Sequence, residues 1–243
     1  MTYIMLESFE LVNGFFIICM VIVFFAVGIS IAVKYFKHKQ KLLLYIGIGW
    51  CGMAITYFFN VVMFLMFVTT GDIIDPSIQF IGLTLTPYFM FLWLIGITEL
   101  LIKEKQKIIL ISWSIFGAFI EIFFIYFLIS DPSEIGDLKP PNDVEFTDFT
   151  IAYLMTVLVI ILITGISFGY QGLKSDNPET KLKGKFLSIA FCSYVLGSIL
   201  EVFSTISIIV LVLGRIIVMS SAVEFYIGTI LPERIKKILK KNF

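Results

Sequence analysis

Histidine is almost absent from this sequence, and cysteine is rare. The single histidine, His38, lies in a lysine-rich segment, which excludes a histidine-rich zinc site inside an apolar segment. The three cysteines, Cys19, Cys51 and Cys192, lie in apolar runs without C-x-x-C spacing. That pattern is typical of buried free thiols rather than of a redox pair. The sequence therefore indicates neither a metal site nor a cofactor.

Long polar stretches and enzyme motifs are also missing. The longest polar stretch, residues 130–148, is expected to be a loop, so no soluble catalytic domain is predicted. No H-E-x-x-H, G-x-S-x-G or glycine-rich nucleotide loop occurs, and we expect a protein that is not an enzyme. The formal net charge is zero, so no nucleic-acid partner is indicated. No basic residue precedes Lys34, and no cleavable signal peptide is expected.

Apolar sequence is abundant, because 59% of the residues are hydrophobic. A membrane span needs about 20 mostly apolar residues to cross about 30 Å of hydrocarbon. Spans are predicted at about 11–33, 42–68, 78–102, 108–129 and 149–170, with two more between 186 and 230. The predicted fold class is an all-α membrane protein, a seven-helix transmembrane bundle whose partners include membrane lipids.

The distribution of positive charge predicts the orientation of the chain. Sixteen of the eighteen Lys and Arg residues lie in the first, third and fifth loops and in the C-terminal tail. The positive-inside rule places these segments in the cytoplasm, so the N-terminus is outside and the number of spans is odd. We expect a multi-pass protein of the cell membrane with one transmembrane domain, residues 1–232. The basic tail, 233–243, is either an amphipathic helix on the inner leaflet or a frayed segment that only fixes topology.

The turn between the last two spans has two possible positions. A turn at Ser204–Ser207 gives spans of more balanced length. A turn at Gly214–Arg215 places the arginine at the outer interface, where its charge is less costly. Both positions stay open on sequence grounds.

A faint internal repeat relates spans one to three to spans five to seven. Gly28-Ile29-Ser30 matches Gly165-Ile166-Ser167, and Ile95-Gly96 matches Ile227-Gly228. Lys39-Gln40-Lys41 resembles Lys183-Gly184-Lys185 in the same order along the chain. These marks indicate two parallel repeats joined by span four, a 3+1+3 plan that occurs in membrane transporters.

Charged residues inside the predicted spans are the candidate functional groups. A charge at the bilayer centre costs about 2.5–3.5 kcal/mol on insertion scales, so such residues usually face the bundle interior. Glu99 is close to Lys103 and is expected to reach the interface instead. If Arg215 lies inside a span, its expected partner is Glu201. The candidates for a ligand-binding or switch site are Glu201, Arg215, Glu224, Glu121, Asn60 and Tyr57.

The layout resembles two families of seven-helix membrane proteins. It is similar to microbial rhodopsins, but retinal attachment in that family needs a lysine in the last span, where this chain has only Arg215. The end of span seven, residues 224–236 (EFYIGTILPERIK), resembles the exit of seven-helix sensor modules that precede histidine kinases in prokaryotes. That resemblance implies a signalling role. Because this sequence has no output domain, a protein partner is expected to supply one.

Three functions are consistent with these features. The first is a non-enzymatic sensor or receptor-like module that binds a small molecule or a lipid near Glu201. The second is a small-solute or proton-coupled transporter, which the repeat and the buried carboxylates favour. The third is a structural or assembly subunit. A closed bundle with an outer pocket favours sensing, a cavity open to alternate sides favours transport, and a filled interior favours the structural role.

Overall fold

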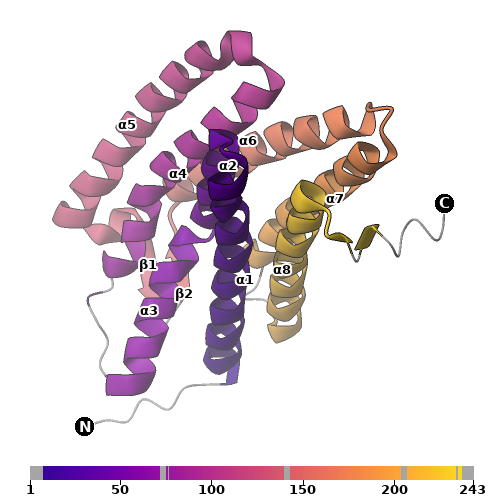
Figure 1. Cartoon of the computed structure of the whole chain (residues 1–243). Coiled ribbons are helices and arrows are strands. Elements are labelled where there is room, and N and C mark those ends of the chain that lie inside the picture. Colours follow the sequence, from indigo (N-terminus) through magenta and orange to yellow (C-terminus); the bar gives the residue numbers. More distant parts are fainter. Residues whose placement is uncertain are drawn as a thin grey trace.

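The protein forms a long helical bundle with one small β-hairpin in a computed structural model, which describes residues 8–71, 75, 77–139, 143–203, 207–233 and 235–236 (Figure 1). The α-helices are α1 (Ser8–His38), α2 (Lys41–Gly52), α3 (Ile55–Thr70), α4 (Ser77–Leu101), α5 (Gln106–Ser130), α6 (Asp148–Leu173), α7 (Pro178–Val202) and α8 (Ile208–Ile230). Two short 3-10 helices, η1 (Lys103–Lys105) and η2 (Pro132–Glu134), flank α5. The hairpin pairs β1 (Gly136–Lys139) with β2 (Asp143–Phe146).

Six of these helices are long and apolar enough to cross a membrane, and α2 with α3 adds a seventh if the pair is one broken span. Every predicted span therefore has a helical counterpart at nearly the predicted position. The chain is accordingly a multi-pass membrane protein built as a helical bundle, as its apolar runs predict.

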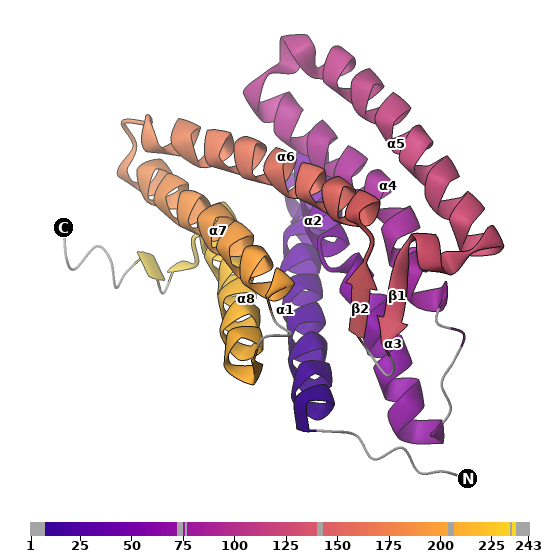
Figure 2. The same ribbon diagram turned by 180° about the vertical axis from the view of Figure 1, so that it is seen from behind.

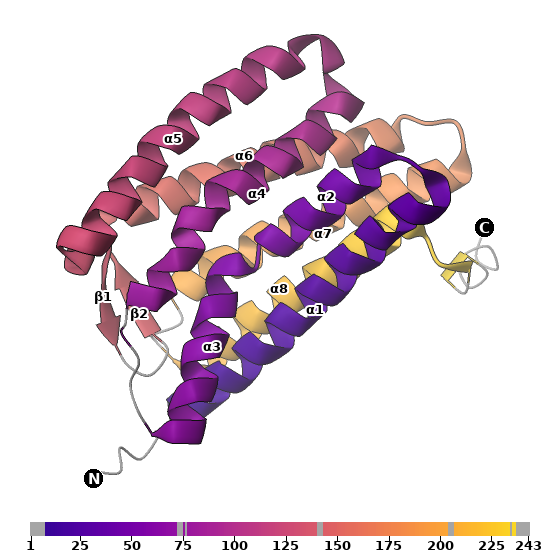
Figure 3. The same ribbon diagram turned by 60° about the vertical axis from the view of Figure 1, so that its left-hand side comes forward.

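The two ends of the bundle differ in charge. Figure 3 shows the α1–α2, α4–α5 and α6–α7 connections and the exit of α8 at one end. These connections carry most of the lysines. The beginning of α1, the end of α3 and the hairpin lie at the opposite end (Figure 3). The bundle therefore has a basic end and a hairpin end.

The helices pack in a closed order around the interior. In sequence order, α1 packs on α2, α2 on α4, α4 on α6, α6 on α7 and α7 on α8, and α1 packs along α8 to close the ring. Helix α5 lies at the edge of the bundle and packs mainly on α4 (Figures 1 and 2). Its outer face remains apolar, with Ile122 70% and Ile129 82% exposed, as expected of a surface that contacts lipid.

Glycines allow the closest helix approaches within each half of the ring. A Cβ atom added to Gly28 of α1 would lie 2.6 Å from the carbonyl oxygen of Gly47 on α2. A Cβ atom added to Gly172 of α6 would lie 2.7 Å from the Cα atom of Gly184 on α7. Small residues at membrane helix contacts bring the backbones together and increase van der Waals contact. These two pairs fix where the spans cross near the basic end.

The structure decides between the two possible turns before the last helix. Helix α7 ends at Val202 and α8 begins at Ile208, so the chain reverses between these two residues, in agreement with the first of the two predicted positions. The hydroxyl of Ser207 accepts a hydrogen bond from the backbone N–H of Val210 at 3.3 Å and caps α8. The alternative turn at Gly214–Arg215 is wrong, because both residues lie inside α8.

The segment predicted to be a loop, residues 130–148, instead contains the hairpin. Ile135 precedes β1 and is fully buried, and its carbonyl oxygen accepts hydrogen bonds from the hydroxyls of Thr147 and Thr150. These contacts hold the hairpin against the start of α6 (Figure 2). The tail helix predicted after Pro232 falls largely on Arg234 and residues 237–243, which lie outside the described residues.

Candidate functional site

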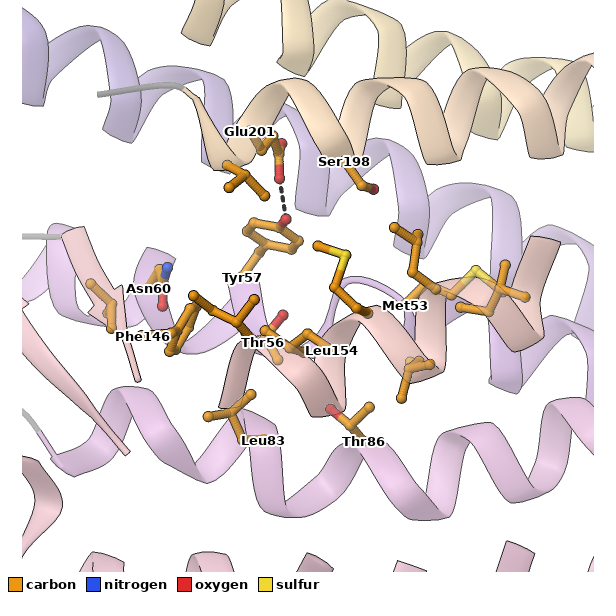
Figure 4. A pocket seen from close by; sticks show the side chains of 18 of the residues that line it. Met53, Thr56, Tyr57, Asn60, Leu83, Thr86, Phe146, Leu154, Ser198 and Glu201 are labelled. Carbon is orange, nitrogen blue, oxygen red and sulfur yellow. Dashed lines mark hydrogen bonds between the residues drawn. The ribbon is translucent and has the colours of Figure 1, made fainter. Parts of the chain in front are cut away.

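A break between α2 and α3 positions the first functional side chain. The backbone N–H groups of Met53 and Ala54 bond to the carbonyls of Trp50 and Cys51, three residues back instead of four. The two helices are bent by 47° at this point. Irregular backbone at membrane depth is tolerated where it is buried in protein or lines a cavity. Beyond the break, α3 carries Tyr57 into the interior (Figure 4).

Tyr57 belongs to a buried polar cluster formed by four helices. Its hydroxyl donates a hydrogen bond to Oε2 of Glu201 near the end of α7 (Figure 4). The other carboxylate oxygen of Glu201 lies 3.2 Å from Nη1 of Arg215 on α8. Nη2 of Arg215 donates to Oδ1 of Asn13 on α1 at 3.4 Å. The cluster therefore joins α1, α3, α7 and α8 in one network.

The geometry of the cluster balances its charges inside the bundle. Arg215 is only 6% exposed, and its guanidinium lies 5.0 Å from the centre of the Tyr57 ring in a cation–π contact. A buried ion pair compensates for the lost hydration of both ions only when further hydrogen bonds complete it, and removal of one partner leaves an uncompensated charge. Tyr57 and Asn13 provide two such bonds, whereas Oε1 of Glu201 and Nε of Arg215 have no hydrogen-bond partner among the described residues. The predicted partnership of Glu201 with Arg215 and Tyr57 is present.

A cavity of about 640 Å³ lies beside this cluster, in the interior of the ring. Its polar wall includes Tyr57, Glu201 and Arg215, and Asn60 lies on the same wall (Figure 4). The remaining wall is mainly apolar and comes from α4, α6 and the hairpin, including Leu83, Met90, Phe146, Leu154 and Met155. The cavity thus has an ionic side and an apolar side.

Gln79 is a cavity residue that sequence reasoning missed. It lies in the first turn of α4, lines the cavity and is only 4% exposed. Neither its amide nitrogen nor its amide oxygen has a hydrogen-bond partner within the described part of the chain. Buried polar groups in native proteins are almost always paired, so an unpaired amide in a cavity wall indicates an absent partner. The sequence feature that could have identified Gln79 is its position as a single glutamine in a long apolar run.

Stacked aromatic rings close the interior between the cavity and the basic end. Trp50 stacks on Phe225 with ring centres 3.7 Å apart and on Phe24 at 5.4 Å. Trp93 and Phe191 pack against the same group, and all five side chains are at most 1% exposed. Trp93 also lines the cavity and forms part of its floor. The cavity is therefore separated from the basic end by close-packed side chains.

Glu121 and Glu224, which were also candidates, do not belong to this site. Glu121 projects from the peripheral helix α5, and Glu224 lies on α8 away from the face that carries Arg215; neither lines the cavity. Each has one buried carboxylate oxygen without a hydrogen-bond partner in the described residues. Glu99 pairs with Lys103 at 2.6 Å near the basic end, as expected from their spacing.

Comparison of the chain with protein-family models, with curated proteins and with solved structures gave no match. The cavity and the residues around it are therefore the main indication of function.

Proposed function

We propose that the protein is a seven-span, non-enzymatic sensor or receptor-like module of the cell membrane that binds a small molecule or a lipid. The main support is the cavity of about 640 Å³ whose wall carries the Tyr57–Glu201–Arg215 cluster. Small-molecule sites are typically cavities of about 300–1,000 Å³ with mostly apolar walls and a few placed polar groups. A purely structural subunit is expected to have a filled interior, so the cavity is evidence against that role.

The location of the cavity favours sensing over transport. Transport requires a site that opens to each side in turn. Here the aromatic cluster of Phe24, Trp50, Trp93, Phe191 and Phe225 fills the interior on the side of the basic end. In the proposed topology the basic end is cytoplasmic, so the cavity serves the outer side.

A route for the signal leads from the cavity to the exit of α8. A ligand that contacts Tyr57 or Glu201 acts on α7, and the Glu201–Arg215 pair connects α7 to α8. At the basic end, Nζ of Lys236 lies 2.5 Å from the carboxylate of Glu179 at the start of α7. Helix α7 is thus linked to α8 beside the cavity and to the segment that follows α8 at the basic end, so a change at the cavity alters the exit of α8. A protein partner bound there would supply the output.

The seven-span topology treats α2 and α3 as one broken span. The alternation of ends in Figure 3 and the basic character of one end are both consistent with an outer N-terminus and a cytoplasmic C-terminus. This is the layout of the sensor modules that the sequence resembles. No nucleic acid is part of the proposal.

A small-solute or proton-coupled transporter is the second candidate, and an internal repeat favours it. Lys39 and Lys183, which begin the matched basic segments, are separated by 183 − 39 = 144 positions. Tyr57 and Glu201 have the same separation of 144 and bond to each other. Trp50 and Tyr194, also 194 − 50 = 144 apart, have ring centres 6.3 Å apart. In a two-fold arrangement, residues near the axis contact their own counterparts.

The packing order of the helices fits the same relation. Under the repeat α1, α2–α3 and α4 correspond to α6, α7 and α8, and the contact of α1 with α8 corresponds to that of α6 with α4. The separation of 144 supports two parallel repeats around a central axis, with α5 as the linker. The separations of 165 − 28 = 137 for Gly28 and Gly165 and of 227 − 95 = 132 for Ile95 and Ile227 then require that the two repeats differ in length on either side of this middle span. Repeats of this kind occur in transporters, which is why transport remains the alternative.

Accessibility of the cavity distinguishes the two functions. Ser198→Cys places a thiol on the cavity wall, and a membrane-impermeant maleimide is applied to right-side-out and to inverted vesicles. The parent chain, which contains Cys19, Cys51 and Cys192, is the control for background labelling. A sensor is expected to label at position 198 only in right-side-out vesicles. Labelling of this thiol from both sides would favour the transporter.

Binding itself is tested by the mass of the intact protein released from its own membrane. We expect a bound small molecule or lipid that is lost in Leu154→Trp, because the larger side chain fills the cavity. Ile122→Trp on the lipid-facing side of α5 is the matched control and should retain the molecule. A molecule retained equally by Leu154→Trp would lie outside the cavity and contradict the proposal.

A further inference from the structure

We infer that the cavity takes an uncharged amphiphile whose head presents a hydrogen-bond acceptor beside a donor, as a carboxamide or lactam does. This inference rests on the proposed function, since it names the chemical class of the ligand for that cavity. Three observations support it: the balanced charges of the cavity wall, the unpaired amide of Gln79 and the apolar wall that extends from it.

The two buried charges of the cavity wall, Glu201 and Arg215, neutralise each other as an ion pair at 3.2 Å. Arg215 is the only basic residue among the described residues that line the cavity, and it pairs with Glu201 and Asn13. An anionic head beside Arg215 would also lie beside the carboxylate of Glu201, which is 3.2 Å from the guanidinium and repels a second negative charge. A cationic head would lie near the guanidinium of Arg215 and would be repelled by its positive charge. Glu145 and Asp148, the other acidic residues of the wall, are exposed near the hairpin and do not offset that repulsion in the interior. An uncharged head avoids both costs.

Gln79 defines the hydrogen-bonding pattern of that head. Its side-chain amide offers two N–H donors and a carbonyl acceptor next to each other, and none of them is used by another described residue. A carboxamide or a lactam presents the complementary acceptor and donor and can form two parallel hydrogen bonds. A carboxylate lacks the donor, an ammonium lacks the acceptor and an ester lacks the donor. Of these four heads, only the amide-type head satisfies both sides of Gln79.

The arrangement of α4 gives the ligand its direction. Gln79, Leu83, Thr86 and Met90 all line the cavity and recur at helical spacing on one face of α4. Eleven residues of helix separate the first from the last, a length of about 16 Å. Thr86 uses its hydroxyl to donate to the carbonyl of Gly82, so this face offers few free polar groups below Gln79. The head therefore lies towards the hairpin end, and the apolar body points towards Trp93.

The test uses the full chain in phosphatidylcholine nanodiscs and four probes with the same ten-carbon chain. Decanamide carries the proposed head, decanoate is anionic, decylammonium is cationic and methyl decanoate only accepts hydrogen bonds. A ligand that binds only the folded state raises the unfolding midpoint. We expect decanamide to raise it by a few degrees and the other three probes to have smaller effects. Oleamide is delivered in the bilayer and decanamide is delivered from water. A comparison of their shifts in the unfolding midpoint distinguishes a lipid-borne ligand from a soluble one.

Gln79→Leu should abolish the decanamide shift, and this variant should fold well because an unpaired buried amide is replaced by an apolar side chain of similar length. Gln171→Leu on the exposed part of α6 is the matched control and should keep the shift. A decanamide shift that survives in Gln79→Leu, a larger shift with a charged probe, or no shift with any probe would overturn the inference. A charged-probe shift that is lost in Leu154→Trp would overturn the ligand class and still support the proposed function.

Discussion

The hydroxyl of Tyr57 donates a hydrogen bond to the carboxylate of Glu201 across the interior of the bundle. Tyr57 follows the break after α2, and Glu201 is one residue before the end of α7. Because Glu201 also pairs with Arg215 on α8, this bond connects the broken helix to the last two helices. The stability of the bundle should therefore depend on the cluster as a unit.

The Glu201–Arg215 pair is tested by a double-mutant cycle. Each single change, Glu201→Gln or Arg215→Gln, leaves one buried charge without its partner, and we expect each to reduce the free energy of unfolding by about 3–5 kcal/mol. The double variant removes both charges and should be destabilised by much less than the sum. Denaturant unfolding in nanodiscs provides the measurement. Additive losses would show that the two side chains do not interact.

Tyr57→Phe removes one hydroxyl and leaves the ring and its contact with Arg215 in place. The lost hydrogen bond has a charged acceptor, so we expect a cost of about 1.5–3 kcal/mol. Tyr170→Phe is the control, because Tyr170 is 54% exposed and should tolerate the change without measurable loss. Equal stability of the two variants would contradict the bond between Tyr57 and Glu201.

The orientation of the bundle is tested with reporter fusions. A reporter fused after Phe243 should be active only as a cytoplasmic fusion, since the basic end is expected to face the cytoplasm. A reporter inserted at the hairpin turn, between β1 and β2, should show the opposite preference. The same side for both sites would rule out the alternation of ends on which the seven-span topology depends.

The link between Lys236 and Glu179 should depend on pH in a defined direction. The carboxylate of Glu179 raises the pKa of Lys236 above its ordinary value of 10.5. A raised pKa in the folded state means that the stabilisation is fully present below about pH 10.5 and is lost as the pH rises through the folded-state pKa. The difference in unfolding midpoint between the parent chain and Glu179→Gln should be constant from about pH 6, where a glutamate carboxylate is ionised, up to about pH 10.5 and then shrink. A difference that grows with pH would contradict the link.

Much of the bundle was predictable because length and apolarity decide where helices form in a membrane. The ends of α4, α5 and α6 differ from the predicted spans by only a few residues. The partnership of Glu201 and Arg215 was predictable for a related reason: two opposite charges on neighbouring helices have few other ways to avoid hydrocarbon.

Other features leave almost no trace in the sequence. The break at Met53–Ala54 has no proline, and both of its flanks are apolar. Hydrophobicity alone therefore predicts one continuous span across the break. The strands of the hairpin have four residues each, too few for a clear alternating pattern. Gln79 and Asn13 are uncharged, and their importance comes from burial, which becomes visible only when the helices are packed.

The aromatic cluster provides the protein with an optical reporter. Of the three tryptophans, only Trp93 lines the cavity; Trp50 is enclosed by Phe24 and Phe225, and Trp113 donates to the carbonyl of Pro87 on the other side of α4. Occupation of the cavity therefore changes the surroundings of Trp93 directly, whereas Trp113 lies outside the cavity wall. In a chain with Trp50→Phe and Trp113→Phe, Trp93 is the one remaining indole and is free of emission from Trp50, whose ring centre lies 6.4 Å away, so that occupancy can be followed without any attached label.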